Sequence, residues 1–451
     1  MMRLTAPVVL PCDEHCTVLR DGVVDLDDAG RIRHVGPSST APLAAGPELA
    51  LTGILMPGLV NVHAHTAMTG LRGLGGDLPL MRWLTEVIWP AELQVDADDV
   101  RAGMLVGALE MLRAGITTSV EMYFYPEAVA DAVLAAGSRA VVTPGIIAAP
   151  GWDRLGSWQQ MLEGIDRWID TDGLRFGPGE RIEVGYGPHA AYTLPAEALA
   201  AAAGAAQERG ALLHIHVAET TGEDTAIREA HGSVPLLLED LGVLGPPDSP
   251  QYESTPRARV LAAHAVHLSD TDIAVLARHH VGVAHCPGSN SKLASGVARL
   301  MDLRAAGIAV GLGTDGPASH DDLDLWHDTR LAALLARLSS GNAAAVTATE
   351  ALLLATRGGA AALGRDDLGT LRPGAWADLV HLGADDPAFA AGLDVPDAQL
   401  LANLVWAAGA RAVRDVWVAG ELVVQAGSST RVDAAEAHAG LRSRVSKITI
   451  R

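Results

Sequence analysis

The sequence predicts an α/β protein built around a TIM-like (β/α)8 barrel, with a small β-sandwich domain made from both ends of the chain. Its 451 residues are enough for one large domain and one smaller one. Short apolar strands alternate with longer helical stretches over residues 58–368, which is the pattern of a parallel barrel. Segments of β type flank this region, and each flank is too small to bury a core by itself.

The elements follow in this order along the chain. Residues 1–57 contain short β segments such as "CTVLRDGVVDLD", separated by turns rich in Gly, Asp and Pro. Helical stretches such as "ADDVRAGMLVGALEMLRAG" then separate eight strand candidates. These eight candidates are residues 59–65, 117–122, 139–146, 182–189, 212–219, 260–266, 281–286 and 309–315. The β pattern returns over residues 369–430, which complete the sandwich, and residues 431–451 predict a helical tail.

Composition and charge exclude several classes of protein. No apolar run reaches the roughly 18 residues of a membrane helix, and the acidic N-terminus does not resemble a secretory signal. A net charge of -21 would repel nucleic acid and anionic membranes. The three cysteines make no disulfide framework. We therefore expect a cytoplasmic globular protein, with residues 245–257 as a surface insertion.

Histidine or acidic residues follow most of the predicted strands. In a barrel the carboxyl ends of the strands form one rim, where catalytic groups gather. These strand-end residues are His63 and His65 (first strand), His189 (fourth), His214, His216 and Glu219 (fifth), His264 and His267 (sixth), His285 (seventh) and Asp315 (eighth). So many on one rim favour a shared site over unrelated solvated side chains.

Four of these residues predict a metal site. His63 and His65 are two apart on a strand and so share a face. With His216 and Asp315 they make a His3Asp ligand set, which suits Zn²⁺ and also tolerates Fe²⁺. His214 shares the face of His216 but lies deeper, and we expect it either to be structural or to support a metal ligand from behind. A binuclear site would need a bridging carboxylate, often a carbamylated lysine at strand four, and no lysine lies there. One metal ion per chain is the favoured prediction.

Hydrolysis is the chemistry that this site suggests. A bound Zn²⁺ lowers the pKa of water toward neutrality. His264 is placed to orient that water, Glu219 to transfer its proton, and Asp315 to help accept it. Attack at a carbon that bears an amino group, or another leaving group, fits this arrangement.

The ordered motifs resemble the amidohydrolase superfamily, and within it the 5-methylthioadenosine/S-adenosylhomocysteine deaminases and their chlorohydrolase relatives. The resemblance spans nearly the whole chain, and its motifs are "MPGLVNVHAHTAMTGLRG", "GYGPHAAY", "HIHVAET", "LAAHAVHL", "HCPGSNSKLASG", "GLGTDGPAS" and "GTLRPGAWADLV". It implies a barrel enzyme of the aminohydrolase type with one zinc per subunit, commonly a dimer or tetramer. The zinc ligands would be His63, His65, His216 and Asp315. His264 would position the water, and Glu219 would be the proton shuttle.

The resemblance also implies substrate contacts. Glu92 would bind the ribose hydroxyls, His189 the nucleoside, and Arg139 the homocysteine carboxylate, with Arg154 as a second arginine; Glu219 would also contact the ring. Two departures are Ala265, where the family usually has Cys, and the long 245–257 insertion.

Three functions remain open from the sequence. The main prediction is a zinc-dependent deaminase of adenosine-type nucleosides. The alternative is another N-heterocycle substrate with the same mechanism: an s-triazine, a guanine-type base or aminodeoxyfutalosine. Glu92 and His189 favour a nucleoside because a bare triazine has no ribose to bind. A non-catalytic scaffold is the third reading, and metal content would separate it from the other two.

Overall fold

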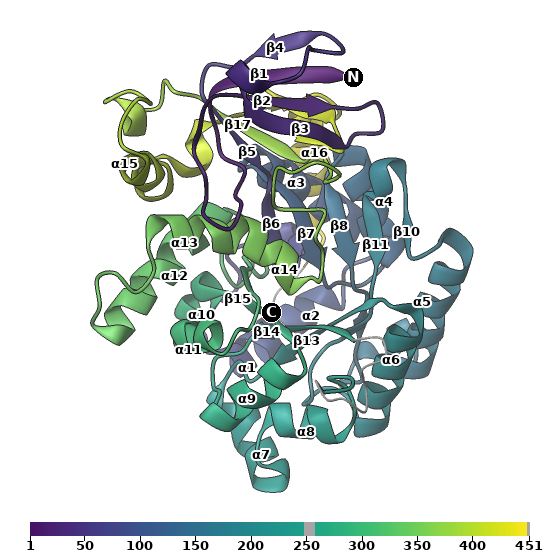
Figure 1. Cartoon of the computed structure of the whole chain (residues 1–451). Helices are drawn as coiled ribbons and strands as arrows, with labels where there is room; N and C mark the ends of the chain where they lie inside the picture. Colours follow the sequence, from purple (N-terminus) through teal and green to yellow (C-terminus); the bar gives the residue numbers. More distant parts are fainter. Residues whose placement is uncertain (248–257, 449–451) are drawn as a thin grey trace.

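The computed structural model describes residues 1–247 and 258–448. Two nine-stranded sheets organise the chain, one mostly parallel and one made by both ends of the chain (Figure 1). Helices follow most strands of the parallel sheet, so the protein is of the α/β class. Within the described residues, no helix is both long enough and apolar enough to cross a membrane.

The parallel sheet contains eight strands from the eight predicted regions. They are β6 (Leu59–Ala64), β7 (Ile116–Glu121), β8 (Arg139–Val142), β11 (Ile182–Val184), β13 (Leu212–Val217), β14 (Arg259–His264), β15 (Gly282–His285) and β16 (Val310–Leu312). The strand order is β11-β8-β7-β6-β16-β15-β14-β13, with the short antiparallel β10 (Arg175–Phe176) outside β11. The two ends of this order meet, because Tyr186, just after β11, bridges to Leu213 of β13.

The third and fourth strands are shorter than the sequence predicts. β8 ends at Val142, and β9 (Gly145–Ile146) resumes the run after Pro144. Proline has no N–H to donate to a strand ladder, which explains the interruption. β9 pairs instead with β12 (Gly187–Pro188), beyond the end of β11.

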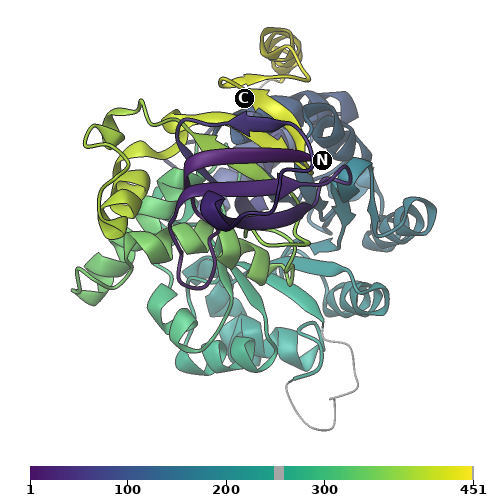
Figure 2. The same ribbon diagram turned by 45° about the horizontal axis from the view of Figure 1, so that its top comes forward.

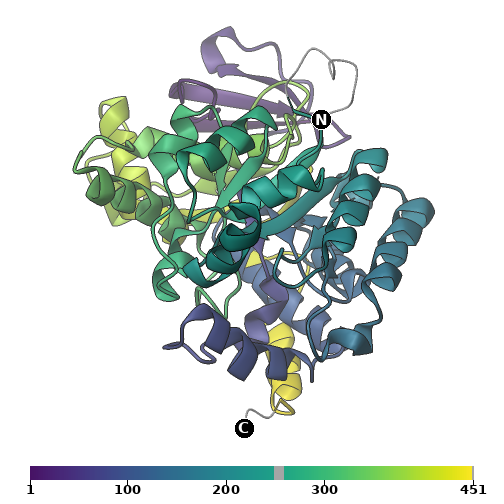
Figure 3. The ribbon, with the colours of Figure 1, turned by 90° about the horizontal axis from the view of Figure 1, so that it is seen from below.

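Helices follow the strands of the parallel sheet and lie around it (Figure 3). They include α3 (Ala97–Arg113), α4 (Pro126–Ala136), α5 (Trp158–Asp172), α6 (Ala196–Arg209), α9 (Asp270–Arg278) and α12 (Leu325–Ser340). α3 begins with a capping box, in which Asp96 and Asp99 each accept the other's backbone N–H. Leu112 of α3, Val133 of α4 and Ile182 of β11 are fully buried in the core between helices and sheet.

The second sheet joins the two ends of the chain. The N-terminal region supplies β1 (Met2–Val9), β2 (Leu19–Leu26), β3 (Ile32–Pro37), β4 (Glu48–Ala50) and β5 (Ile54–Pro57). The C-terminal region supplies β17 (Leu379–Leu382), β18 (Val413–Val418), β19 (Glu421–Gln425) and β20 (Ser428–Ser429). β5 and β17 pair antiparallel, and Figure 2 shows the two sets of strands side by side. The hydrogen bonds form one continuous sheet, whereas the sequence predicts a sandwich.

The C-terminal helix α16 (Ala434–Val445) packs against α3, which follows β6 of the parallel sheet. Arg444 donates hydrogen bonds to Asp98 and Asp99 at the start of α3, at 2.9 and 3.2 Å. Leu441 is buried on the same side. The predicted helical tail is therefore docked beside α3.

Candidate metal and catalytic site

The four predicted metal ligands meet at the carboxyl ends of β6, β13 and β16. The Nε2 atoms of His63 and His65 lie 3.1 and 3.3 Å from Oδ1 of Asp315. The Nε2 of His216 lies 3.4 Å from the Nε2 of His65. One ring nitrogen from each of the three histidines lies within 4.8 Å of the others. The structure thus brings all four side chains to one point.

Each of these histidines is held by its other ring nitrogen. Nδ1 of His65 donates to the backbone oxygen of Met122 at 2.6 Å, and Nδ1 of His216 donates to that of His189 at 2.7 Å. Nδ1 of His63 shares a 2.8 Å hydrogen bond with His214. Such outer contacts fix the tautomer and the ring orientation in metal sites. All three rings therefore present Nε2 to the same space.

The donor set fits a divalent transition metal. Nε2 of His63 is fully buried and makes no hydrogen bond within the described part of the chain. Burial lowers the pKa of His63 to about 4 and that of His216 well below its usual value. Both rings are then neutral at physiological pH, the form that binds metal. Three nitrogens and one carboxylate suit Zn²⁺ with one open position.

Several residues that support this set were not identified as functional from the sequence. Oδ2 of Asp315 accepts hydrogen bonds from Ser289 at 2.6 Å and from Ser319 at 2.8 Å. His214, expected to be structural or to support a ligand, connects His63 to the hydroxyl of Thr143, 3.1 Å from its Nδ1. The "PGSNS" and "GPAS" segments after strands seven and eight mark where such hydroxyls occur. Their residue types alone do not reveal which carboxylate they contact.

His264 and Glu219 lie beside the ligand set. Nδ1 of His264 lies 2.9 Å from Oδ1 of Asn290, so its Nε2 points the other way, 3.7 Å from Oε2 of Glu219. Burial, together with the charge of Asp315, raises the pKa of Glu219 well above its usual value. A carboxyl group with a raised pKa can donate a proton near neutral pH. His264 and Asp315 both have positive φ angles, 68° and 59°, a strained backbone often found at functional sites.

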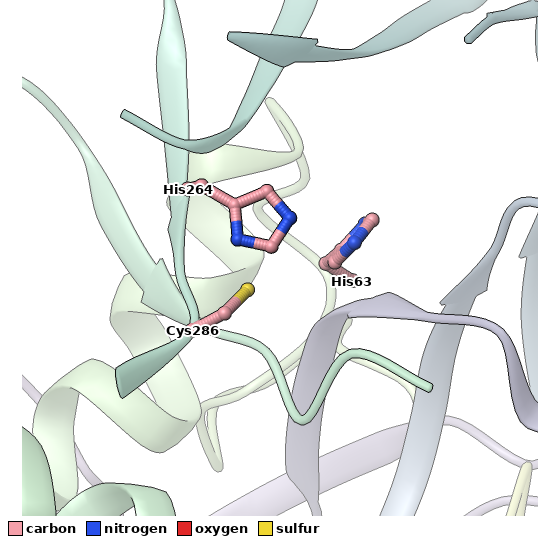
Figure 4. Close-up of side chains that lie close together, drawn as sticks. All are labelled: His63, His264 and Cys286. Carbon is pink, nitrogen blue, oxygen red and sulfur yellow. The ribbon is translucent and has the colours of Figure 1, made fainter. Parts of the chain in front are cut away.

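Cys286 offers a competing set of ligands with His63 and His264. Figure 4 shows His264 and Cys286 extending from neighbouring segments toward His63. The Cys286 thiol donates to the backbone oxygen of Ala284 at 3.5 Å, and burial raises its pKa well above the usual value. Since only the thiolate is a strong metal ligand, the set with Asp315 fits a metal better.

A cavity lined by aromatic side chains opens above the ligand set. Its polar end contains His65, His189, His216, Glu219, His264 and Asp315. Its walls include Leu80, Trp83, Ile88, Trp89, Phe124, Ile147, Trp152 and Tyr192. Such a site, apolar with a few convergent polar groups, is typical of small-molecule binding.

Two predicted substrate residues, Glu92 and His189, line this cavity. Burial raises the pKa of Glu92 to about 7, against the opposing effects of a hydrogen bond with Tyr123 and the charge of Arg154. Burial lowers the pKa of His189 to about 3, and its Nδ1 lies 3.1 Å from the hydroxyl of Thr193. The neutral His189 ring can accept or donate one hydrogen bond to a ligand.

Arg139, a predicted substrate residue, lies away from the ligand set and does not line the cavity. It is the first residue of β8, so it lies at the amino end of the strand, away from the rim. Its guanidinium is buried and makes a bidentate ion pair with Asp378 at 2.8 and 3.1 Å. It also donates to the backbone oxygens of Gly179 and Glu180. Four of its N–H groups are used in these contacts.

Arg154 lies close to the cavity but outside its lining. It donates to the backbone oxygens of Glu92 at 2.9 Å and Val95 at 3.2 Å, and to the hydroxyl of Tyr125 at 3.0 Å. These contacts join the loop after β9 to the end of α2 (Trp89–Glu92). Arg154 therefore supports the segment that positions Glu92.

A separate histidine–carboxylate cluster lies in the loop after β16. The buried His320 has its Nε2 3.2 Å from Asp328 and its Nδ1 3.1 Å from Asp322. Burial lowers the pKa of His320, but the two carboxylates outweigh it and raise that pKa to about 11. His320 is thus a buried cation in the same loop as Ser319, directly after it.

Comparison with known proteins places this site in a family. Residues 54–423 match the family described as "Amidohydrolase family". The chain therefore belongs to the amidohydrolase family.

Individual relatives cover almost the entire chain. A 5-methylthioadenosine/S-adenosylhomocysteine deaminase from Pelotomaculum thermopropionicum is 41% identical, over 90% of this chain and 89% of the relative. A 5'-deoxyadenosine deaminase from Methanosarcina mazei is 40% identical, over 92% and 91%. A solved structure of an adenosine deaminase from Xanthomonas campestris with bound zinc superposes with a TM-score of 0.89 at 33% identity, covering 99% of each chain.

Proposed function

We propose that this protein is a zinc-dependent hydrolytic deaminase of adenosine-type nucleosides, which converts them to inosine-type products and ammonia. One observation supports this most strongly: three histidine Nε2 atoms and the Asp315 carboxylate converge beside Glu219, at the polar end of an aromatic cavity. The names of the relatives, which include deaminases of four adenosine-type nucleosides, agree with this function. The proposal includes a (β/α)8 barrel over residues 58–368, and a smaller domain from residues 1–57 and 369–430.

His63, His65, His216 and Asp315 would hold one Zn²⁺. When bound there, the metal supplies a Lewis acid that makes water easier to deprotonate. The supporting contacts of these ligands, from Met122, His189, His214, Ser289 and Ser319, keep the set in place without substrate.

Proton transfer is assigned to the acidic groups beside the ligands. Water adds to C6 of the purine while Glu219, in its protonated form, donates a proton to N1. Asp315 accepts the proton that the water loses and passes it to the amino group, which leaves as ammonia. As the C–N bond breaks, the new C6 hydroxyl becomes the 6-oxo group and its proton returns to Glu219. His264, held by Asn290, orients the water through its Nε2. The atoms balance: one water enters, and ammonia and the 6-oxo purine leave.

Glu92 and His189 are the proposed nucleoside contacts. Glu92 lies in the cavity wall and would accept or share hydrogen bonds with the ribose hydroxyls. His189 lies beside His216, with ring centroids 4.7 Å apart, and would contact the nucleoside close to the metal. A base bound at the ligands with its ribose at Glu92 uses both ends of the cavity.

Ammonia release across adenosine, 5-methylthioadenosine, S-adenosylhomocysteine, guanine, cytosine and triazines tests this proposal. Zinc-loaded protein should deaminate adenosine-type nucleosides far faster than free bases or triazines. Faster ammonia release from guanine or a triazine would show that the proposed substrate class is wrong, although the hydrolytic site would stand. Glu92→Gln offers a matched control, since it should weaken turnover of nucleosides and leave a substrate without ribose unaffected.

A further inference from the structure

A second cavity of about 250 Å³ lies directly beside the first. Tyr123, Phe124 and Gly145 line both cavities. The Phe124 ring stacks on Trp152 of the first cavity, with centroids 4.2 Å apart. The remaining residues around the second cavity are Tyr125, Pro126, Glu127, Pro144, Leu155, Met161, Gly164, Ile165 and Trp168.

The second cavity adjoins the part of the first where the ribose is proposed to bind. Arg154 donates to both the Glu92 backbone oxygen and the Tyr125 hydroxyl, at 2.9 and 3.0 Å. Tyr125 lines the second cavity, so a single guanidinium connects its wall to the Glu92 segment. A nucleoside with its base at the ligands and its ribose at Glu92 can therefore direct its 5′ carbon toward this space.

The chemistry of the lining is apolar and has no positive charge. Among the described residues that line either cavity, none is lysine or arginine. The charged side chain of the second cavity is Glu127, a carboxylate. Arg139 is paired with Asp378 at the opposite end of β8, and Arg154 is directed to Glu92, Val95 and Tyr125. A substrate carboxylate placed here would lose water without gaining a cationic partner, which costs free energy.

We propose that the second cavity receives the 5′ substituent of the nucleoside and selects neutral, apolar groups over an amino-acid tail. This inference rests on the proposed function. An apolar space of about 150 Å³ already accepts benzene, so 250 Å³ has room for a methylthio or short alkylthio group. The substrate class is thus adenosine with a 5′ hydroxyl, hydrogen or short thioether, and S-adenosylhomocysteine is a poor substrate.

The experiment compares kcat/KM for adenosine, 5′-deoxyadenosine, 5′-methylthioadenosine and S-adenosylhomocysteine, using the zinc-loaded full chain. Methylthioadenosine should exceed S-adenosylhomocysteine by at least about fivefold, the scale of one unpaired, partly solvated charge. A smaller ratio, with all four nucleosides turned over, would overturn this inference and leave the proposed function intact. Failure of all four would refute the proposed function and this inference with it.

Two substitutions add the missing positive charge. Glu127 is exposed at the start of α4, so Glu127→Arg should fold, and Glu127→Gln is its matched control. Met161→Arg on α5, with Met161→Leu as control, places a cation at another point of the same wall. At least one arginine variant should raise the S-adenosylhomocysteine to methylthioadenosine ratio about threefold over its control. Unchanged ratios in both, with thermal unfolding like the controls, would contradict the assignment.

Arg154→Met distinguishes the two roles open to that residue. If Arg154 positions Glu92, as its contacts indicate, all four nucleosides should lose kcat/KM by a similar factor. A loss confined to S-adenosylhomocysteine would mean that Arg154 binds the carboxylate, and would overturn the inference.

Discussion

Replacing Arg139 by Met should destabilise the protein strongly while leaving substrate preference unchanged. The Arg139 side chain makes two hydrogen bonds to Asp378 and one each to the backbone oxygens of Gly179 and Glu180. Its guanidinium also lies 5.0 Å from the ring centroid of Trp376. Asp378 directly precedes β17, so the ion pair between Arg139 and Asp378 connects the parallel sheet to the sheet of the chain ends.

The magnitude follows from burial. Arg139 is 1% exposed and Asp378 is 4% exposed, so removing the cation leaves a buried carboxylate with one remaining donor, the backbone N–H of Ala419 at 2.7 Å. Breaking a buried pair in this way costs about 3 to 5 kcal/mol. That is a large share of the roughly 5 to 15 kcal/mol by which a folded domain is stable.

Urea unfolding of zinc-loaded wild type, Arg139→Met, Asp378→Asn and the double variant measures this cost. The double variant should be less destabilised than the two single losses added together, because the unpaired charge is then absent. Ratios of kcat/KM between nucleosides should match those of the wild type. A stability loss below about 1 kcal/mol, together with a selective loss on S-adenosylhomocysteine, would refute the structural role.

Three further predictions concern the metal, the shuttle and the loop cation. Metal analysis of active protein should give one transition metal ion per chain; two ions, or none, would contradict the ligand set of His63, His65, His216 and Asp315. Glu219→Gln should keep the metal but lower kcat by about 10²- to 10⁴-fold; if it retained more than about a tenth of wild-type activity, Glu219 would not be the shuttle. The pKa of His320 rises from 6.5 to about 11 on folding, so its contribution to stability is complete below about pH 6.5 and is lost as pH rises toward about 11. Across that pH range the unfolding free energy of His320→Gln should fall less steeply than that of the wild type. Equal slopes for the two proteins would show that the His320 ion pairs do not cause the loss of stability with rising pH.

Much of the fold was predictable because strand and helix periodicity is a local property. The eight predicted regions each contain a strand of the parallel sheet, and the two flanks join in one sheet. That the flanks form one continuous sheet instead of the expected sandwich was not predictable in this way, because whether β5 and β17 pair edge to edge or face to face depends on contacts distant in sequence. The break at Pro144 follows from its missing N–H, which is a local property that the sequence does contain.

The site, like the fold, has a part that the sequence predicts and a part that it does not. His63, His65, His216 and Asp315 converge because strand ends of a parallel sheet share one edge, which the sequence pattern already indicates. Ser289, Ser319 and Asn290 reach the site from loops, where chain direction cannot be inferred from residue type. Arg139 is the first residue of β8 and so lies at the opposite end of the strand from the rim, a position that the family resemblance alone does not reveal.

The antiparallel pairing of β5 with β17 has a consequence during protein synthesis. β5 ends at Pro57, and its partner begins only at Leu379. On a ribosome that adds 5 to 20 residues per second, β5 waits on the order of half a minute for that partner. Throughout this interval one edge of β5 has unpaired backbone groups and can recruit a strand from another nascent chain. Fragments that end before β17 should therefore aggregate. Slower translation should lengthen the time for which β5 is unpaired, and so should increase the binding of chaperones to the nascent chain.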